Sequence, residues 1–323
     1  MMTKRFRFHW NDFLQRFSGL LILLALGLFL ANRSEFFLTQ RNLTNIALQT
    51  SILTIVAFGV AMTMLTGGID LSVGSVAAFS GAVCAGLLVH HEINVLLAIV
   101  VALLMGISIG LVNGLLIVFG KLPPFVATLA TMAIARGMTL VYTDGRPITV
   151  LDEPFVYLGN GYIGPVPVPV CIMLLLFFFA SFLLTQTKLG RAIYAIGGNA
   201  KTAHLAGINV IKGTVFVYGF SAFTASLGGI LLTARLWSAQ PTTGVGLELE
   251  AIAAAVLGGV SLFGGVGGIF GVIIGVMIIG MLSNGLNLLE ISSYYQQVIK
   301  GIVFVLAVIL DMYAKKRKTV VSK

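Results

Sequence analysis

Long apolar segments separated by short polar stretches dominate this chain. A helix needs about 20 mostly apolar residues to cross a bilayer. On that basis we predict ten spans, near residues 14–32, 43–66, 73–90, 94–119, 123–142, 166–186, 211–235, 248–264, 266–288 and 297–313. Of the 323 residues, 58% are hydrophobic and 10% are charged. A soluble fold lacks the polar residues to cover so much apolar surface, so the sequence predicts an all-α integral membrane protein.

Basic residues gather on one predicted side of the membrane. An even number of spans places both termini on the same side, and most of the 20 basic residues fall there. They are Lys4, Arg5, Arg7, Arg16, Lys121, Lys188, Arg191, Lys201, Lys212, Lys315, Lys316, Arg317, Lys318 and Lys323. The positive-inside rule makes this side cytoplasmic. The net charge of +9 therefore orients the chain and does not indicate nucleic-acid binding.

Glycines at four-residue spacing predict close helix packing. Gly106, Gly110 and Gly114 form one line, and Gly267, Gly271 and Gly275 form another. Each line leaves a flat stripe on one helix face, so that a neighbouring helix can approach closely.

A short repeat suggests two related halves. The sequence Asn-Gly-Leu closes the fourth predicted span at residues 113–115 and the ninth at 284–286. Spans that are five apart cross the membrane in opposite directions. We therefore expect inverted halves, at about 43–142 and 211–313, with a transport path between them.

Residues 67–75 interrupt the apolar pattern with the sequence GGIDLSVGS. Asp70 and Ser72 suit the start of a new helix. One interpretation is a broken or re-entrant segment that lines a pathway, because non-helical backbone is tolerated at depth only against protein or water. The other is a tight cytoplasmic turn followed by a capped helix.

Two further groups of polar residues are candidates for a pathway. Arg136 falls inside the fifth predicted span, and it either lines the pathway or extends to the interface. Asn284, Asn287, Tyr294 and Gln296 lie around the end of the ninth span. Amides, hydroxyls and rings suit a neutral polyol, whereas the alternative is an interfacial aromatic belt with a helix cap.

Signatures of catalysis are absent from the sequence. Gly120-Lys121 is followed by Leu122, so no phosphate-binding loop is present, and His90-His91 precede Glu92 without the spacing of a zinc protease. Cys84 and Cys171 have no metal-ligand spacing. We expect a chain that is not an enzyme and that binds no cofactor itself, so any ATP and Mg would be held by a partner.

The hydrophilic loop over residues 187–210 is the longest basic stretch between apolar segments. Its glycines and basic residues suit a docking surface for a soluble partner. The alternative is a solvated loop that serves only to orient the chain.

Several short motifs occur along the chain from about residue 40 to the C-terminus. They are GIDLSVG at 68–74, LGR at 189–191, YAIGGN at 194–199, SAQP at 238–241, AIAA at 251–254, LGG at 257–259, SL at 261–262, NGLNLL at 284–289 and SSYYQ at 292–296. Together these motifs resemble the permease subunits of bacterial ABC importers for monosaccharides, the ribose-type permeases. Glu290 and residues 144–164 depart from the family pattern.

This resemblance implies a single transmembrane permease domain over residues 1–323 in the bacterial cytoplasmic (inner) membrane. It also implies a homodimer surrounded by membrane lipid, a cytoplasmic ABC ATPase that holds ATP and Mg, and an extracytoplasmic sugar-binding protein. Residues 190–208 then correspond to a coupling helix. Its expected contact residues are Gly190, Arg191, Tyr194, Gly197, Gly198, Asn199, Lys201 and Gly207. The expected pathway residues are Asp70, Ser72, Arg136, Asn284, Asn287, Tyr294 and Gln296.

A rival interpretation is a secondary transporter of a small polar solute that uses an ion gradient. Inverted halves and broken helices suit that class equally well. It would normally need buried ionisable groups, for which Asp70 and Asp311 are the nearest candidates, both at predicted span ends. Neither interpretation identifies the sugar from sequence.

Overall fold

The structure, a computed structural model, describes the backbone of residues 10–321 and the side chains of residues 19–309, 311 and 312. Lys4, Arg5, Arg7 and Lys323, used above to orient the chain, lie outside the described residues. The helices are α1 (Trp10–Arg33), α2 (Gln40–Leu65), α3 (Val73–Val89), α4 (Val95–Val118), α5 (Pro124–Thr143), α6 (Glu153–Asn160), α7 (Val168–Gln186), α8 (Lys188–Gly198), α9 (Ala200–Leu205), α10 (Val210–Leu236), α11 (Leu247–Leu257), α12 (Ile269–Leu288) and α13 (Ser293–Val321). The strands are β1 (Ile148–Thr149), β2 (Tyr162–Ile163), β3 (Val166–Pro167) and β4 (Ser238–Ala239).

Six helices among the described residues have the length and apolar composition to cross a membrane: α2, α4, α5, α7, α10 and α12. Shorter apolar helices cover Gly19–Arg33, Val73–Val89 and Ser293–Ile309. The predicted class, an all-α membrane protein with several spans, is confirmed.

The predicted span over 248–264 is wrong in its second part. Helix α11 has only 11 residues and ends at Leu257, and turns follow up to the start of α12 at Ile269. Gly259, Gly264 and Gly265 adopt φ values of 85°, 84° and 73°. Such left-handed backbone ends a helix and is open mainly to glycine. The apolar residues between these glycines kept the hydropathy high and concealed the turn.

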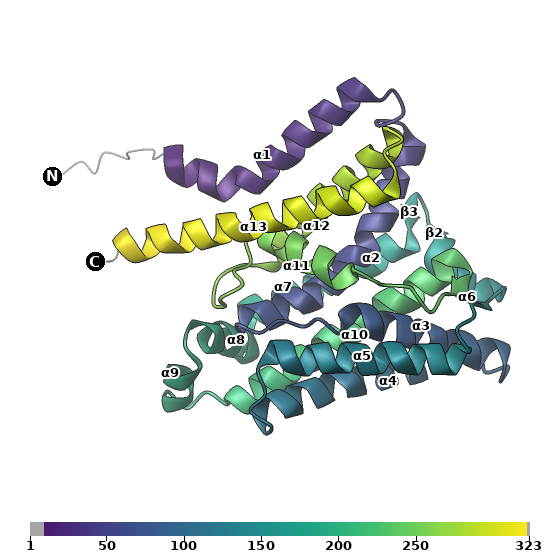
Figure 1. Cartoon of the computed structure of the whole chain (residues 1–323), viewed down its shortest axis with the longest axis horizontal. Helices are drawn as coiled ribbons and strands as arrows, with labels where there is room; N and C mark the ends of the chain where they lie inside the picture. The colour runs from purple at the N-terminus through teal and green to yellow at the C-terminus, as the bar shows by residue number, and fades with distance from the viewer. Residues whose placement is uncertain (1–9, 322–323) are drawn as a thin grey trace.

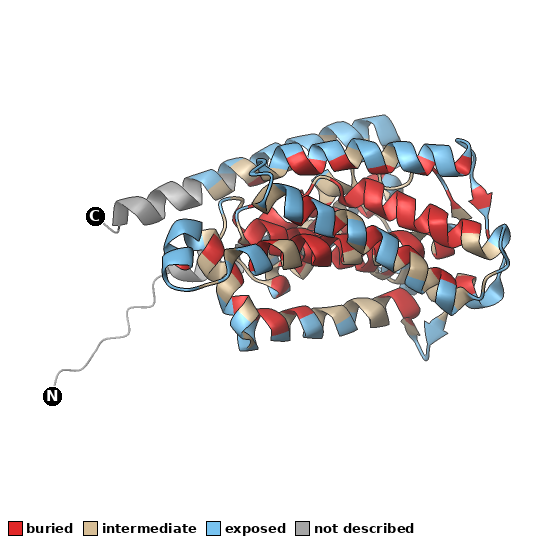
Figure 2. Cartoon of the chain, turned by 90° about the horizontal axis from the view of Figure 1, so that it is seen from below, coloured by how far each residue is buried: buried red, intermediate tan, exposed pale blue. Residues whose placement is uncertain are grey.

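Helix α10 lies at the centre of the fold and packs on α2, α3 and α4. Figure 2 shows buried residues concentrated in the inner helices and exposed residues on the outward faces of the outer ones. Gly110 of α4 lies directly against the Tyr218 carbonyl and the Ala222 side chain of α10, and Gly229 of α10 lies against the Ala77 backbone of α3. The predicted glycine stripe of α4 therefore does allow close helix approach.

The two ends of the bundle carry different segments (Figure 1). The short helices α8 and α9 lie at one end, together with the N-terminal end of α1 and the C-terminal end of α13. Helix α6 and the β2–β3 pair lie at the opposite end. There, β1 pairs with β4, with Ile148 opposite Ala239, which joins the segment after α5 to the segment after α10.

We expect Gly110→Ala to destabilise the protein, because a methyl group there collides with the backbone of α10. Overpacking of this kind costs about 1–3 kcal/mol. Gly137→Ala is the matched control, because its added carbon meets no atom within 4 Å. Thermal unfolding in detergent should show a lower midpoint for Gly110→Ala only. Equal midpoints for the two variants would contradict the packing.

Candidate functional site

Helix α8 presents one buried face and one exposed face. Gly190, Ile193 and Ile196 are buried, whereas Arg191 is exposed. The Thr187 hydroxyl accepts a hydrogen bond from the Gly190 amide at 3.1 Å and caps the helix. The hydrophilic stretch is thus a helix that lies against the bundle, not a loose loop.

Helix α9 continues the exposed surface. The Asn199 side chain accepts a hydrogen bond from the Thr202 amide at 2.9 Å and starts this second short helix. Lys201 and Gly207 are exposed, and Leu205 is 79% exposed. An exposed leucine between basic residues, at the tip of a short helix, suits contact with another protein.

Glycine allows α8 to contact the C-terminal end of α2. A side chain at Gly197 would collide with the Leu65 carbonyl and the Gly265 amide, whereas Gly198 faces open space. The Gly265 amide also donates to the Leu65 carbonyl at 2.9 Å. Helix α8, the end of α2 and the turn after α11 are therefore in direct backbone contact.

Tyr194 adds a side-chain link between α8 and the same turn. Its hydroxyl donates to the Gly267 carbonyl at 2.9 Å. Burial raises the pKa of Tyr194 above its usual value, so the hydroxyl stays a neutral donor at physiological pH. Of the eight residues predicted for this surface, Gly190, Tyr194 and Gly197 face the bundle, whereas Arg191, Gly198, Asn199, Lys201 and Gly207 are exposed.

The segment between α2 and α3 is buried rather than displayed on a surface. Asp70 and Ser72 have no exposed area, and one carboxylate oxygen of Asp70 accepts from the Ser72 amide at 2.9 Å and its hydroxyl at 2.6 Å. Asn113 of α4 donates to the Ser72 hydroxyl at 3.1 Å and accepts from Thr131 of α5 at 2.7 Å. A polar network thus joins the broken segment to α4 and α5.

The second oxygen of Asp70 and the hydroxyl of Ser221 on α10 are both buried. Neither atom has a partner at hydrogen-bonding distance among the described residues. The burial suits a broken segment that is covered by protein, as bilayer depth requires. The role of Asp70 and Ser72 in a pathway stays a prediction.

Arg136 of α5 is hydrogen-bonded to a second non-helical segment, residues 237–246 between α10 and α11. Its guanidinium donates to the Pro241 carbonyl at 2.6 Å and to the Thr243 carbonyl at 2.9 Å. Glu248 at the start of α11 attracts the same guanidinium. These two carbonyls lie outside any helix, and the guanidinium supplies the hydrogen-bond donors that they need.

The start of α3 meets the non-helical segment 237–246. Gly74, at the start of α3, and Gly244 approach so closely that neither has room for a side chain. The starts of α3 and α11 therefore lie side by side within the bundle.

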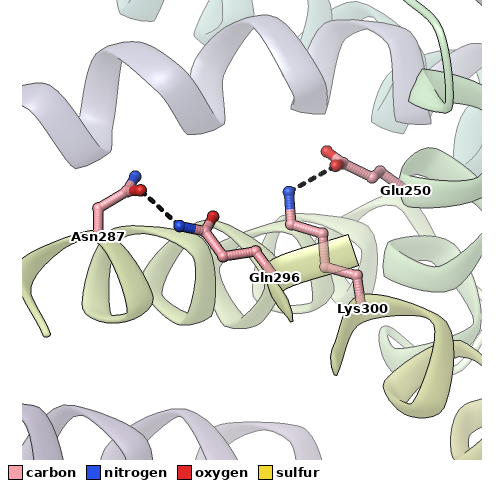
Figure 3. A network of polar contacts seen from close by, with 4 residues as sticks. All are labelled: Glu250, Asn287, Gln296 and Lys300. Atoms are coloured by element: carbon pink, nitrogen blue, oxygen red, sulfur yellow. Dashed lines mark hydrogen bonds and ion pairs between the residues drawn. The ribbon is translucent and has the colours of Figure 1, made fainter. Parts of the chain in front are cut away.

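The predicted polar group near the end of α12 divides into three parts. Asn284 is buried and exchanges hydrogen bonds of 2.7 and 3.0 Å with Asn42 of α2. Asn287 accepts from Gln296 of α13 at 2.8 Å (Figure 3). Tyr294 is 82% exposed and points to the outside of the bundle.

A charged pair that the sequence reasoning missed lies close to Gln296. Lys300 of α13 donates to Glu250 of α11 at 2.7 Å (Figure 3). The available signal was one acid and one base in neighbouring apolar segments, a pattern that is rare inside membranes. In the part of the chain with described side chains, no group of three or more histidine, cysteine or acidic residues could hold a metal ion.

Comparison with known proteins matches residues 42–308 to the family described as "branched-chain amino acid transport system / permease component". The chain belongs to this permease family. The ribose import permease protein of Haemophilus influenzae is 47% identical over 94% of this chain and 94% of the relative. That of Bacillus subtilis is 47% identical over 96% of this chain and 97% of the relative.

A further relative is the D-allose transport system permease protein of Escherichia coli, 39% identical over 96% of this chain and 95% of the relative. No solved structure matches the chain. Membership in this permease family supports a role in transport rather than catalysis.

We expect Arg136→Met to destabilise this permease, because it leaves the carbonyls of Pro241 and Thr243 without a donor. A buried polar group left unpaired costs about 1–3 kcal/mol. The exposed Arg146 provides the control variant, Arg146→Met. Thermal unfolding in detergent checks the difference, and an unchanged midpoint for Arg136→Met would show that the clamp does not stabilise the fold.

Proposed function

We propose that this chain is the membrane-spanning subunit of an ATP-driven ABC importer that carries ribose or a closely related sugar into a bacterium. The observation that carries the proposal is 47% identity to proteins named ribose import permeases, over 94% of this chain or more. The family description names branched-chain amino acids, but these full-length relatives are named for sugars. Their names therefore favour a sugar.

The chain is built of two inverted halves with ten membrane-spanning segments, counting α11 as a short one. The support is that equivalent helices of the two halves have equivalent neighbours. Helix α10 packs on α2, α3 and α4, and α2 packs on α10, α11 and α12. Likewise, α3 packs on α4 and α5, while α11 packs on α12 and α13. A non-helical segment follows both α2 and α10.

The two long central helices run in opposite directions. The C-terminal end of α2, at Leu65, contacts α8, and the N-terminal part of α10 contacts α9. This is the arrangement that an inverted repeat requires.

The end of the bundle with α8 and α9 faces the cytoplasm, and so do both termini. The support is the concentration of basic residues there, including Lys188, Arg191 and Lys201, together with the positive-inside rule. The opposite end, with α6 and the β2–β3 pair, faces outward and receives sugar from a binding protein. The chain resides in the cytoplasmic membrane as a homodimer.

Helices α8 and α9 receive the ATPase, which holds ATP and Mg. An exposed basic surface meets the partner, while the buried face of α8 contacts α2 and the turn after α11 through backbone. A displacement of α8 therefore moves both halves of the permease together. The chain supplies a pathway with two states, and the ATPase and the binding protein each bias the equilibrium between them.

Uptake of radiolabelled ribose into cells or proteoliposomes tests the function. Proteoliposomes that contain this chain, its ATPase and its binding protein should take up ribose only when ATP is present. A protonophore added while ATP is maintained should leave the rate unchanged. Loss of uptake on collapse of the proton gradient, with ATP intact, would instead establish the ion-driven alternative.

Gly197→Val should uncouple ATP hydrolysis from uptake. The added side chain collides with the C-terminal end of α2 and with the turn after α11. Gly198→Ala is the matched control at the next position, where nothing lies within 4 Å. ATP hydrolysis and ribose uptake are measured on the same proteoliposomes. Normal uptake by a folded Gly197→Val protein would remove α8 from its proposed coupling role.

A further inference from the structure

Glu250 and Lys300 form the only ion pair within 4 Å among the residues whose side chains the structure describes. They join α11 to α13, and their side chains are 33% and 27% exposed. Lys300 lies two turns inside the apolar helix that begins at Ser293. Charges at such depth are costly against lipid and face protein or water instead. The partly exposed pair therefore marks a place on α13 that lipid tails do not cover.

The pair lines a cavity of about 440 Å³ between α11, α12 and α13. Ser293, Gln296 and Gln297 contribute further polar side chains, and Phe304 contributes a ring. The volume lies within the range of small-molecule sites, about 300–1,000 Å³. Gln296 is held in place, because its amide nitrogen donates at 2.8 Å to Asn287 (Figure 3) and at 2.8 Å to the Ile291 carbonyl.

The lining groups match the chemistry of a polyhydroxylated ligand. A carboxylate accepts hydrogen bonds, an ammonium donates them, and amides and a hydroxyl do both. One acid and one base leave the cavity neutral overall, so a ligand with net charge gains no long-range attraction there. The Phe304 ring offers an apolar surface for the C–H face of a sugar.

We propose that this cavity binds a neutral monosaccharide during translocation, with Glu250 and Lys300 in contact with its hydroxyl groups. The inference rests on the proposed import function and adds to it a site within one subunit. When sugar is bound, its hydroxyl groups take the place of part of the contact between Glu250 and Lys300. When the sugar has left, the two side chains pair with each other.

The first experiment measures ATP-dependent ribose uptake by proteoliposomes that contain the complete importer. The variants are Glu250→Gln, Lys300→Met and the double variant. Each single variant should lower uptake by about tenfold, because it removes hydrogen bonds between a charged group and the ligand.

The double variant separates sugar contact from a structural role. A pair that served only to hold α11 to α13 predicts a different result. Each single variant would leave one charge unpaired, and the double variant, which removes both charges, would recover much of the lost uptake. Contact with sugar predicts that the double variant is no better than the poorer single one. Recovery in the double variant, or unchanged uptake in both singles, would overturn the cavity as a sugar site.

A cysteine experiment gives a direct readout of occupancy that needs no transport. In a background with Cys84→Ala and Cys171→Ala, the variants Gln297→Cys and Leu205→Cys are labelled with a polar maleimide. Ribose should slow labelling at position 297 several-fold and leave position 205, on the exposed surface of α9, unchanged. Equal rates with and without ribose at both positions would overturn the proposal. Failure of the wild-type importer to take up ribose would instead overturn the import function on which it rests.

Discussion

The close approach of helix backbones around α10 is the interaction on which the rest of this structure depends. Lipid tails are as apolar as leucine, so helices in a membrane gain little from hiding apolar side chains and associate through close packing instead. Gly59 of α2, Gly110 of α4 and Gly229 of α10 each meet a neighbouring helix where no side chain would fit. Helices α2, α3, α4 and α10 consequently form one tightly packed block.

Two stretches of backbone beside that block are not helical. Residues 66–72 and 237–246 contain peptide groups that no helix satisfies, and a bilayer offers them no water. Arg136 supplies donors to the second segment, and Thr128 and Tyr218 donate to the Ile69 carbonyl of the first, at 3.2 and 3.5 Å. Buried polar side chains near Asp70 thus have a structural reason to be there, independent of any solute.

The short helix α11 owes its position to the second of these segments. Its first turn places Glu250 beside α13. The glycine-rich turn after its last residue contacts α8. One rigid element therefore contacts both the polar cavity and the surface proposed to receive the ATPase. A movement of α8 has a direct physical route to the cavity, without a long chain of intermediate contacts.

The sequence by itself determined the membrane class, most of the helices, the glycine stripe of α4, the break before α3 and the hydrophilic, basic character of residues 187–210. All of these are local properties of hydropathy and spacing, which is why they could be predicted. The end of α11 at Leu257 could not, because glycine occurs both inside helices, as at Gly271 and Gly275, and in left-handed turns. Only tertiary contacts choose between the two.

Tertiary structure also decided which polar residues meet. Glu250 and Lys300 are 50 residues apart, and Asn42 and Asn284 are 242 apart. Close to the buried Asp70, Ser72 meets Asn113 of α4, which lies 41 residues away in the chain. No local pattern encodes such pairings, because they arise when helices that are distant in the chain come into contact. An unpaired polar group is costly in hydrocarbon, so the favoured helix arrangement is the one in which each polar side chain has a hydrogen-bond partner.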